Sequence, residues 1–111
     1  MNKRLRLRPE ELKPLATQYG SCRASDKIVV DGEKVGFMFR EEPDEPHDSG
    51  WRFLSGTETE DYINQPGRLA RYDVNFVANC DPEVVPHLGA AVGVAFERAG
   101  EAFVETLAEL P

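Results

Sequence analysis

The sequence lacks the features that mark several large classes of protein. No apolar run approaches the roughly 20 residues of a membrane-spanning helix, and no apolar segment follows the basic residues at the start. We therefore expect neither a membrane span nor a secretory signal. Only two cysteines occur, Cys22 and Cys80, and they lack CxxC spacing, which favours free thiols in a reducing compartment. The expected location is cytoplasmic.

Signatures of cofactor sites are also missing. The two histidines, His47 and His87, lie far apart and have no histidine or cysteine neighbours at zinc-ligand spacing. No Walker or GxGxxG pattern occurs. A Cys–His nucleophile built on Cys22 would need a contact in space that the sequence does not show. We therefore expect no metal and no cofactor.

Basic residues are scarce beyond the first third of the chain. Residues 1–40 hold nine Lys/Arg against five Asp/Glu, whereas residues 41–111 hold four against fifteen, and the net charge is −7. This balance opposes binding to nucleic acid or to an anionic membrane. The basic excess begins in residues 1–8, which we predict to be a flexible basic tail. Residues 9–111 are predicted to form a single domain.

Local patterns predict short strands and helices. Segments 27–30 and 35–39 are rich in β-branched and aromatic residues and flank an Asp-Gly turn signal, which predicts a β-hairpin. A third short strand is predicted at 51–54. Helix starts are predicted at Thr57, with a capping-box pattern and an end near residue 64, and at Asp81, which precedes a proline.

The C-terminal half contains less decisive patterns. Residues 72–79 fit either a helix or a strand. Residues 92–96 and 102–107 fit two closing strands, although 101–110 fits a helix equally well. Long helices do not separate the strands, so a doubly wound parallel sheet is not expected. The predicted fold class is α+β: a small, mostly antiparallel sheet with short helices packed to one side.

The most informative segment is acidic and leads into the only tryptophan, Trp51. Two prolines interrupt it and exclude a regular helix. Its five carboxylates fall within eight positions: Glu41, Glu42, Asp44, Glu45 and Asp48. Charge steers protein encounters and aromatic residues anchor interfaces, so these residues are predicted to bind a partner. The alternative is a solvated acidic loop over a buried tryptophan.

Three longer runs carry a family resemblance. The run VDGEKVGFMFREEPDEPHDSGWRFLSG, then YDVNFVANCDPEVVP, then GVAFER, resembles the bacterial immunity protein 33 family over about residues 22–98. The DSGW and YD-N motifs carry most of the resemblance. Phe37 and Phe39 stand where tyrosines are common in the family, and Val74 stands where leucine is common, which keeps the hydrophobic pattern.

The resemblance implies a cytosolic, antitoxin-like protein of a bacterial polymorphic toxin system. Such a protein binds a cognate toxin domain stoichiometrically and has no enzymatic activity. The YD-N motif adds Tyr72, Asp73 and Asn75 to the predicted partner-binding residues, with local capping or an Asx turn as the alternative for Asp73 and Asn75. A basic nuclease is one candidate partner, because nucleases must bind phosphate.

Two other functions remain open from the sequence, as does the oligomeric state. The first is a small housekeeping module that binds a cellular partner. The second is a ligand-binding or enzyme domain that uses Cys22 with His47 or His87 and a carboxylate.

Overall fold

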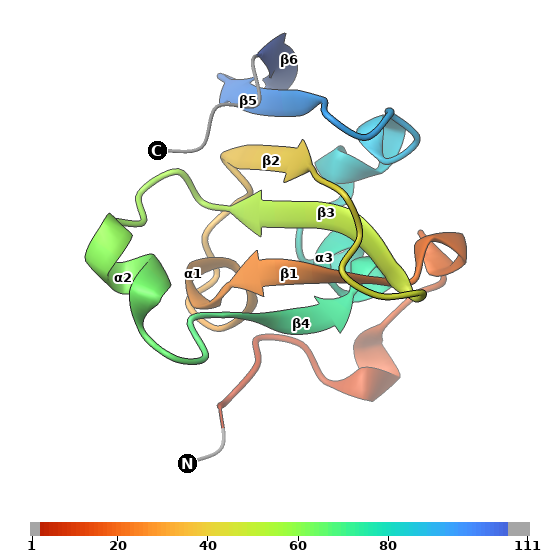
Figure 1. Cartoon of the computed structure of the whole chain (residues 1–111). Coiled ribbons are helices and arrows are strands. Elements are labelled where there is room, and N and C mark those ends of the chain that lie inside the picture. The colour runs from red at the N-terminus through yellow and green to blue at the C-terminus, as the bar shows by residue number, and fades with distance from the viewer. Residues whose placement is uncertain (1–2, 107–111) are drawn as a thin grey trace.

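A computed structural model describes residues 3–106, which form one six-stranded sheet with short helices (Figure 1). The strand order is β4-β1-β3-β2-β5-β6. Neighbouring strands are antiparallel except β1 and β3, which run parallel. The strands are β1 (Ser21–Ser25), β2 (Phe37–Arg40), β3 (Asp48–Leu54), β4 (Leu69–Asp73), β5 (Ala95–Ala99) and β6 (Ala102–Thr106). The predicted α+β class with a mostly antiparallel sheet is confirmed.

The helices are all short. The α-helices are α1 (Asp26–Val29), α2 (Glu60–Asn64) and α3 (Val74–Cys80). The 3-10 helices are η1 (Pro9–Glu11), η2 (Thr17–Tyr19) and η3 (Pro82–His87). Within residues 3–106, none of these helices has the length and apolar character needed to cross a membrane.

The sheet has two different faces. We call one the helix face, because its side chains form the main core with α1, α3 and η3; from the strands it contains Cys22, Ala24, Met38, Trp51, Phe53 and Phe96. We call the other the open face, which carries a smaller cluster of Phe39, Leu54 and Ala95. Figure 1 shows the sheet from the open face, with α3 behind it. Among the helices of residues 3–106, α2 alone packs against the open-face cluster, through Ile63.

One predicted strand is wrong. Residues 27–30, expected as the first arm of a hairpin, lie in and just after α1. The Ser25 hydroxyl accepts a hydrogen bond from the amide of Lys27 (3.1 Å) and caps this helix, and the Val30 amide donates to the carbonyl of Asp26 (2.8 Å). Local capping thus overrides the β-branched composition. The second arm is real, but β2 pairs with β3 and β5 instead.

Other predicted elements are correct or shifted. Two closing strands do form the antiparallel pair β5 and β6, but β5 begins at Ala95, three residues later than the expected 92–96. The rest of the helical alternative, 107–110, lies outside the described residues. The ambiguous segment 72–79 contains the end of β4 and most of α3. Asp81 caps η3 as predicted. The helix expected from Thr57 begins instead at Glu60, with Thr59 as its N-cap, and ends at Asn64.

The basic N-terminal segment lies against the domain from residue 3 onward. Lys3 Nζ contacts Asp26 Oδ1 at 2.8 Å, and the Arg6 amide donates to the carbonyl of Val29 at 2.8 Å. Leu5 and Leu7 pack against the main core. These contacts tie residues 3–8 to α1, while the flexibility expected of residues 1–8 stays a prediction.

Candidate functional site

Three arginines form a row across the open face. Arg71 on β4 is in register with Arg23 on β1, and Arg23 is in register with Arg52 on β3. Because residues in register on adjacent strands point to the same face, the three guanidinium groups lie side by side. Like charges at such positions destabilise a sheet, so the row needs counter-charges.

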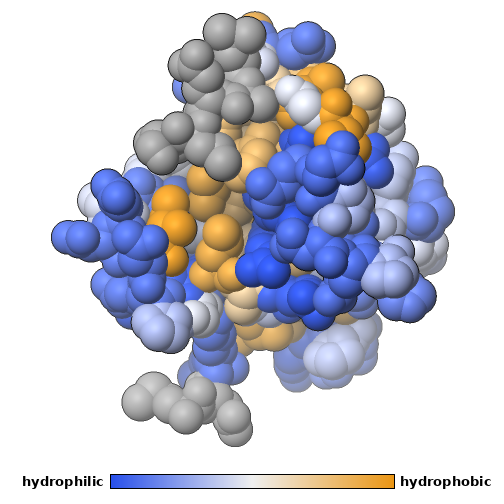
Figure 2. Space-filling model, in the orientation of Figure 1, coloured by the Kyte–Doolittle hydropathy of each residue, from blue (hydrophilic) through white to orange (hydrophobic). Residues whose placement is uncertain are grey.

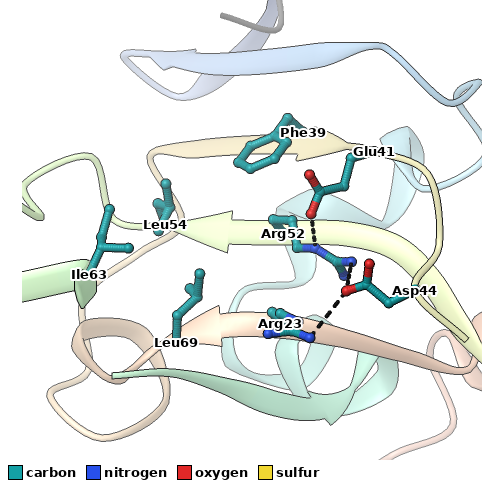
Figure 3. A pocket seen from close by; sticks show the side chains of 8 residues that line it. All are labelled: Arg23, Phe39, Glu41, Asp44, Arg52, Leu54, Ile63 and Leu69. Carbon is teal, nitrogen blue, oxygen red and sulfur yellow. Dashed lines mark hydrogen bonds and ion pairs between the residues drawn. The ribbon is translucent and has the colours of Figure 1, made fainter. Parts of the chain in front are cut away.

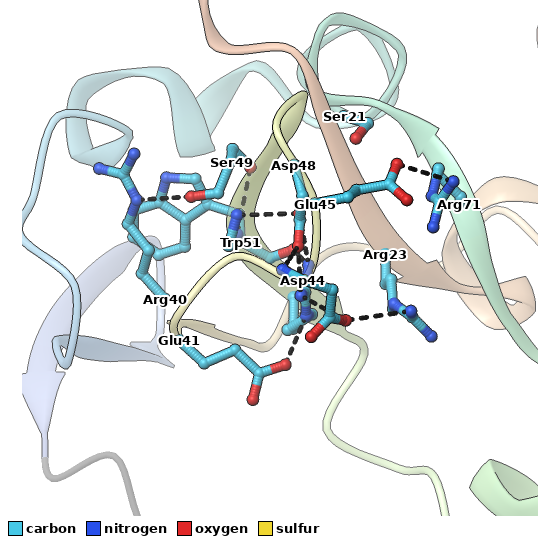
Figure 4. Close-up of polar contacts among 12 residues, drawn as sticks. Ser21, Arg23, Arg40, Glu41, Asp44, Glu45, Asp48, Ser49, Trp51 and Arg71 are labelled. Atoms are coloured by element: carbon cyan, nitrogen blue, oxygen red, sulfur yellow. Dashed lines mark hydrogen bonds and ion pairs between the residues drawn. The ribbon is translucent and has the colours of Figure 1, made fainter.

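The acidic loop, residues 41–47 between β2 and β3, supplies those counter-charges (Figure 4). Glu45 pairs with Arg71 at 2.8 Å, and Asp44 pairs with Arg23 at 3.1 Å. Glu41 reaches the Nε of Arg52 at 2.6 Å. Each arginine of the row therefore has its own carboxylate from the loop. The loop is held on the sheet and does not extend freely into solvent.

Arg52 and Asp48 form the buried centre of this arrangement. Their side chains are 1% and 6% exposed, and Nη1 and Nη2 of Arg52 contact the two Asp48 oxygens at 2.9 and 2.7 Å. Asp48 also accepts hydrogen bonds from the amides of Asp44 and Gly50. The hydrogen bonds from Arg52 hold the pKa of Asp48 well below its ordinary value despite burial. Asp48 is thus charged, and both of its carboxylate oxygens already accept hydrogen bonds from within the protein.

The DSGW motif shapes the base of the acidic loop. Gly50 has a φ of +89°, and a Cβ atom there would collide with the carbonyl oxygen of Glu41. Ser49 accepts a hydrogen bond from the amide of Trp51, and the indole Nε1 donates to the carbonyl of Leu88 at 3.0 Å. Trp51 is fully buried on the helix face, so it cannot supply the exposed aromatic anchor expected from the sequence.

The YD-N motif has a different local role for each residue. Asn75 Oδ1 accepts hydrogen bonds from the amides of Leu15 and Ala16, both at 2.8 Å, which fixes the segment before η2. Tyr72 stacks on Phe76 with ring centres 5.8 Å apart. Asp73 is exposed at the end of β4.

Asp73 is nevertheless close to the acidic loop along the sheet. It is in register with Ser21, which is itself in register with Asp48. The structure therefore brings Asp73 to the same end of the sheet as the loop. Tyr72 instead packs on Phe76, and Asn75 holds the segment before η2. Asp73 is the member of this motif that adds negative charge to the same surface.

The loop keeps a surplus of negative charge after pairing. The four carboxylates of the loop and Asp48 at the start of β3 face the three arginines of the row, which leaves two negative charges (five minus three). Glu42 is exposed and forms no ion pair within residues 3–106. Glu41 and Asp44, although paired, keep 44% and 56% of their side-chain surface in solvent. The result is an acidic surface whose side chains are already positioned.

A hollow next to the arginine row was not predicted from the sequence (Figure 3). It has a volume of about 290 Å³. Its apolar lining comes from four elements and consists of Phe39, Leu54, Ile63 and Leu69. Its charged lining consists of Arg23, Arg52, Glu41 and Asp44. The sequence did contain a signal for this hollow. Strands β2 and β3 carry apolar side chains toward the open face as well as toward the helix face.

Cys22 and His87, two groups of the alternative enzyme-like site, both lie against apolar surroundings. Cys22 is buried on the helix face, and burial raises the pKa of its thiol, which disfavours the thiolate that a nucleophile needs. His87 packs against Phe96 and Phe103, with ring centres 4.6 and 5.4 Å away. No group of three or more metal-ligating side chains occurs among the residues that the structure describes.

Sequence comparison assigns the chain to a class, the immunity proteins. The family model described as "Immunity protein Imm33 domain" matches residues 22–107, which include all six strands apart from the first residue of β1. The chain belongs to this Imm33 family, as the resemblance of the DSGW and YD-N runs indicated. No curated protein and no solved structure matches the chain.

Proposed function

We propose that the chain neutralises a cognate toxin domain by binding it stoichiometrically, as part of a bacterial polymorphic toxin system. The family assignment carries the immunity role. The acidic loop supports binding as the mechanism, because its carboxylates are held in fixed positions by the arginine row. A surface that is ordered before binding loses less conformational entropy when the complex forms.

The exposed carboxylates are the groups we propose to contact the toxin. They are the exposed Glu42, Asp44 and Asp73 and the half-exposed Glu41 and Glu45. The other predicted residues hold this surface in place without facing the partner. Asp48 pairs with Arg52, and Trp51 lies in the core. Tyr72 and Asn75 make their contacts next to β4.

The charge of the surface favours a basic partner. The loop has more carboxylates than arginines, and the whole chain carries a net charge of −7. Long-range attraction between opposite charges accelerates association and weakens with added salt. A nuclease is our proposed partner class, because an enzyme that binds phosphate must present a basic surface.

A matched pair of charge-reversal variants tests this proposal. Glu42→Lys with Glu45→Lys changes the loop without touching the buried Arg52–Asp48 pair. Glu101→Lys with Glu105→Lys makes the same change of net charge at exposed positions in and beside β6. We expect a neighbouring gene to encode the cognate toxin domain. Stopped-flow association with that domain should be at least about tenfold slower for the loop variant at low salt.

The control variant should associate within about twofold of the unchanged protein, because its substitutions lie far from the loop along the sheet. Equal slowing by both variants would show that only net charge matters. An unchanged rate for the loop variant would refute steering by the loop. Co-expression with the toxin tests the function itself: the unchanged chain should restore growth of cells that produce the toxin.

A further inference from the structure

Two adjoining hollows form a groove on the open face. The hollow beside the arginine row and a second one of about 240 Å³ share Leu54 and Ile63 in their linings, so they lie side by side. The second hollow extends the groove past Phe37 toward β5. Figure 2 shows a band of hydrophobic surface running down the middle of this face, with hydrophilic surface on both sides.

The apolar lining of the groove is not needed to close the main core. The helix face buries its own continuous cluster around Trp51 and Phe53, and the groove residues belong to the separate open-face cluster. Ile63, Leu69 and Phe37 remain partly exposed in it. Apolar surface that gathers in a hollow with a polar rim is typical of an interaction site.

Carboxylates stand at both ends of the groove. Glu41 and Asp44 line it beside the arginine row, and Glu58 and Glu97 line its other end. The two arginines at the first end, Arg23 and Arg52, are already paired with carboxylates of the chain. Glu41 and Asp44 are themselves the partners of these arginines, so the first end has balanced charge. Glu58 and Glu97 leave the other end acidic, so the groove is complementary to an apolar group next to a positive charge.

We infer that this groove is the docking site for a segment of the toxin domain that carries one or two apolar side chains next to a lysine or arginine. The inference rests on the proposed function and adds the anchor to it. The two hollows have volumes of about 290 and 240 Å³, which leaves room for side chains of a partner segment. The acidic loop steers the toxin domain toward the chain. The groove provides the apolar anchoring that the sequence analysis had assigned to Trp51.

The test compares two pairs of apolar substitutions. Ile63→Ser with Leu69→Ser removes apolar surface from the groove. Leu15→Ser with Val92→Ser removes exposed apolar surface outside it, at side chains that are 39% and 43% exposed. Binding of the purified toxin domain encoded beside this chain is measured by surface plasmon resonance at physiological salt, and thermal melting confirms that each variant is folded.

The groove variant should bind at least about tenfold more weakly, mainly through faster dissociation, because anchors act on the bound state. The control variant should stay within about twofold of the unchanged protein. A second measurement needs no substitution: toxin binding should slow amide hydrogen exchange in α2, Glu60–Asn64, which borders the groove through Ile63.

The outcomes separate the groove from the function. Weak binding by the groove variant alone, together with slowed exchange in α2, supports the groove. Equal binding by all three proteins with unchanged exchange in α2 overturns the groove and leaves toxin neutralisation standing. If the unchanged protein neither binds the toxin domain nor protects cells from it, the proposed function fails, and the groove inference fails with it.

Discussion

The Arg52→Met substitution tests the physical basis of the site. Arg52 is 1% exposed and donates hydrogen bonds to Glu41, to both oxygens of Asp48 and to the carbonyl of Trp51. Methionine fills similar volume but removes the charge. Asp48, which is 6% exposed, would then be a buried carboxylate without its partner.

The expected loss of unfolding free energy is about 3–5 kcal/mol, which is typical when one member of a buried ion pair is removed. Domains of this size have a total stability of only about 5–15 kcal/mol, so the loss should be visible in a urea titration at pH 7. Arg71→Met provides the control: it removes an exposed pair with Glu45 and should cost less than about 1 kcal/mol.

A double variant isolates the pairwise contribution. Adding Asp48→Asn to Arg52→Met removes the uncompensated charge, so the double variant should recover part of the lost stability. The acidic loop should also lose order in Arg52→Met, seen as faster amide exchange at Asp44, whose amide donates to Asp48. If Arg52→Met is no less stable than Arg71→Met, the buried pair does not organise the loop and the reasoning is refuted.

Three further predictions concern Asp48, Asn75 and the two cysteines. Because folding lowers the pKa of Asp48, its stabilisation is present above the unfolded value of about 4 and is lost as the pH falls. Asp48→Asn should therefore flatten the fall in stability below about pH 4 in acid titrations followed by circular dichroism. Asn75→Ala leaves two amides without their acceptor and should cost about 1–3 kcal/mol in urea unfolding. Burial raises the pKa of Cys80 to about 11 and also raises that of Cys22, so a thiol reagent at pH 8 should modify both only after unfolding; rapid reaction of the native protein would contradict their burial.

Local signals were enough to predict several parts of the fold. The closing hairpin of β5 and β6 and the cap at Asp81 each depend on residues within a few positions of one another. The N-terminal strand was not predicted, because its sequence, SCRAS, has no apolar run. It joins the sheet through parallel pairing with β3, a contact between residues about 27 positions apart that no local pattern reports.

The burial of Arg52 could not be predicted for a similar reason. Strand alternation places it on the face opposite to Trp51 and Phe53, and arginine side chains are seldom fully buried. The acidic loop folds back over that face and buries the Arg52 side chain. The pairs between the loop and Arg23 or Arg71 join residues 21 and 26 positions apart, and they become visible only in three dimensions. The sequence therefore indicated the acidic segment but not the arginine row that holds it.

The central claim, stoichiometric capture of a toxin domain, is tested most directly by isothermal titration calorimetry of the purified chain into the toxin domain encoded beside it. We expect one-to-one binding whose affinity falls as salt rises, since the acidic loop contributes charge. Saturation at that ratio, with loss of toxin activity at the same point, would support the account. Absence of binding at low salt, with both proteins folded, would contradict it.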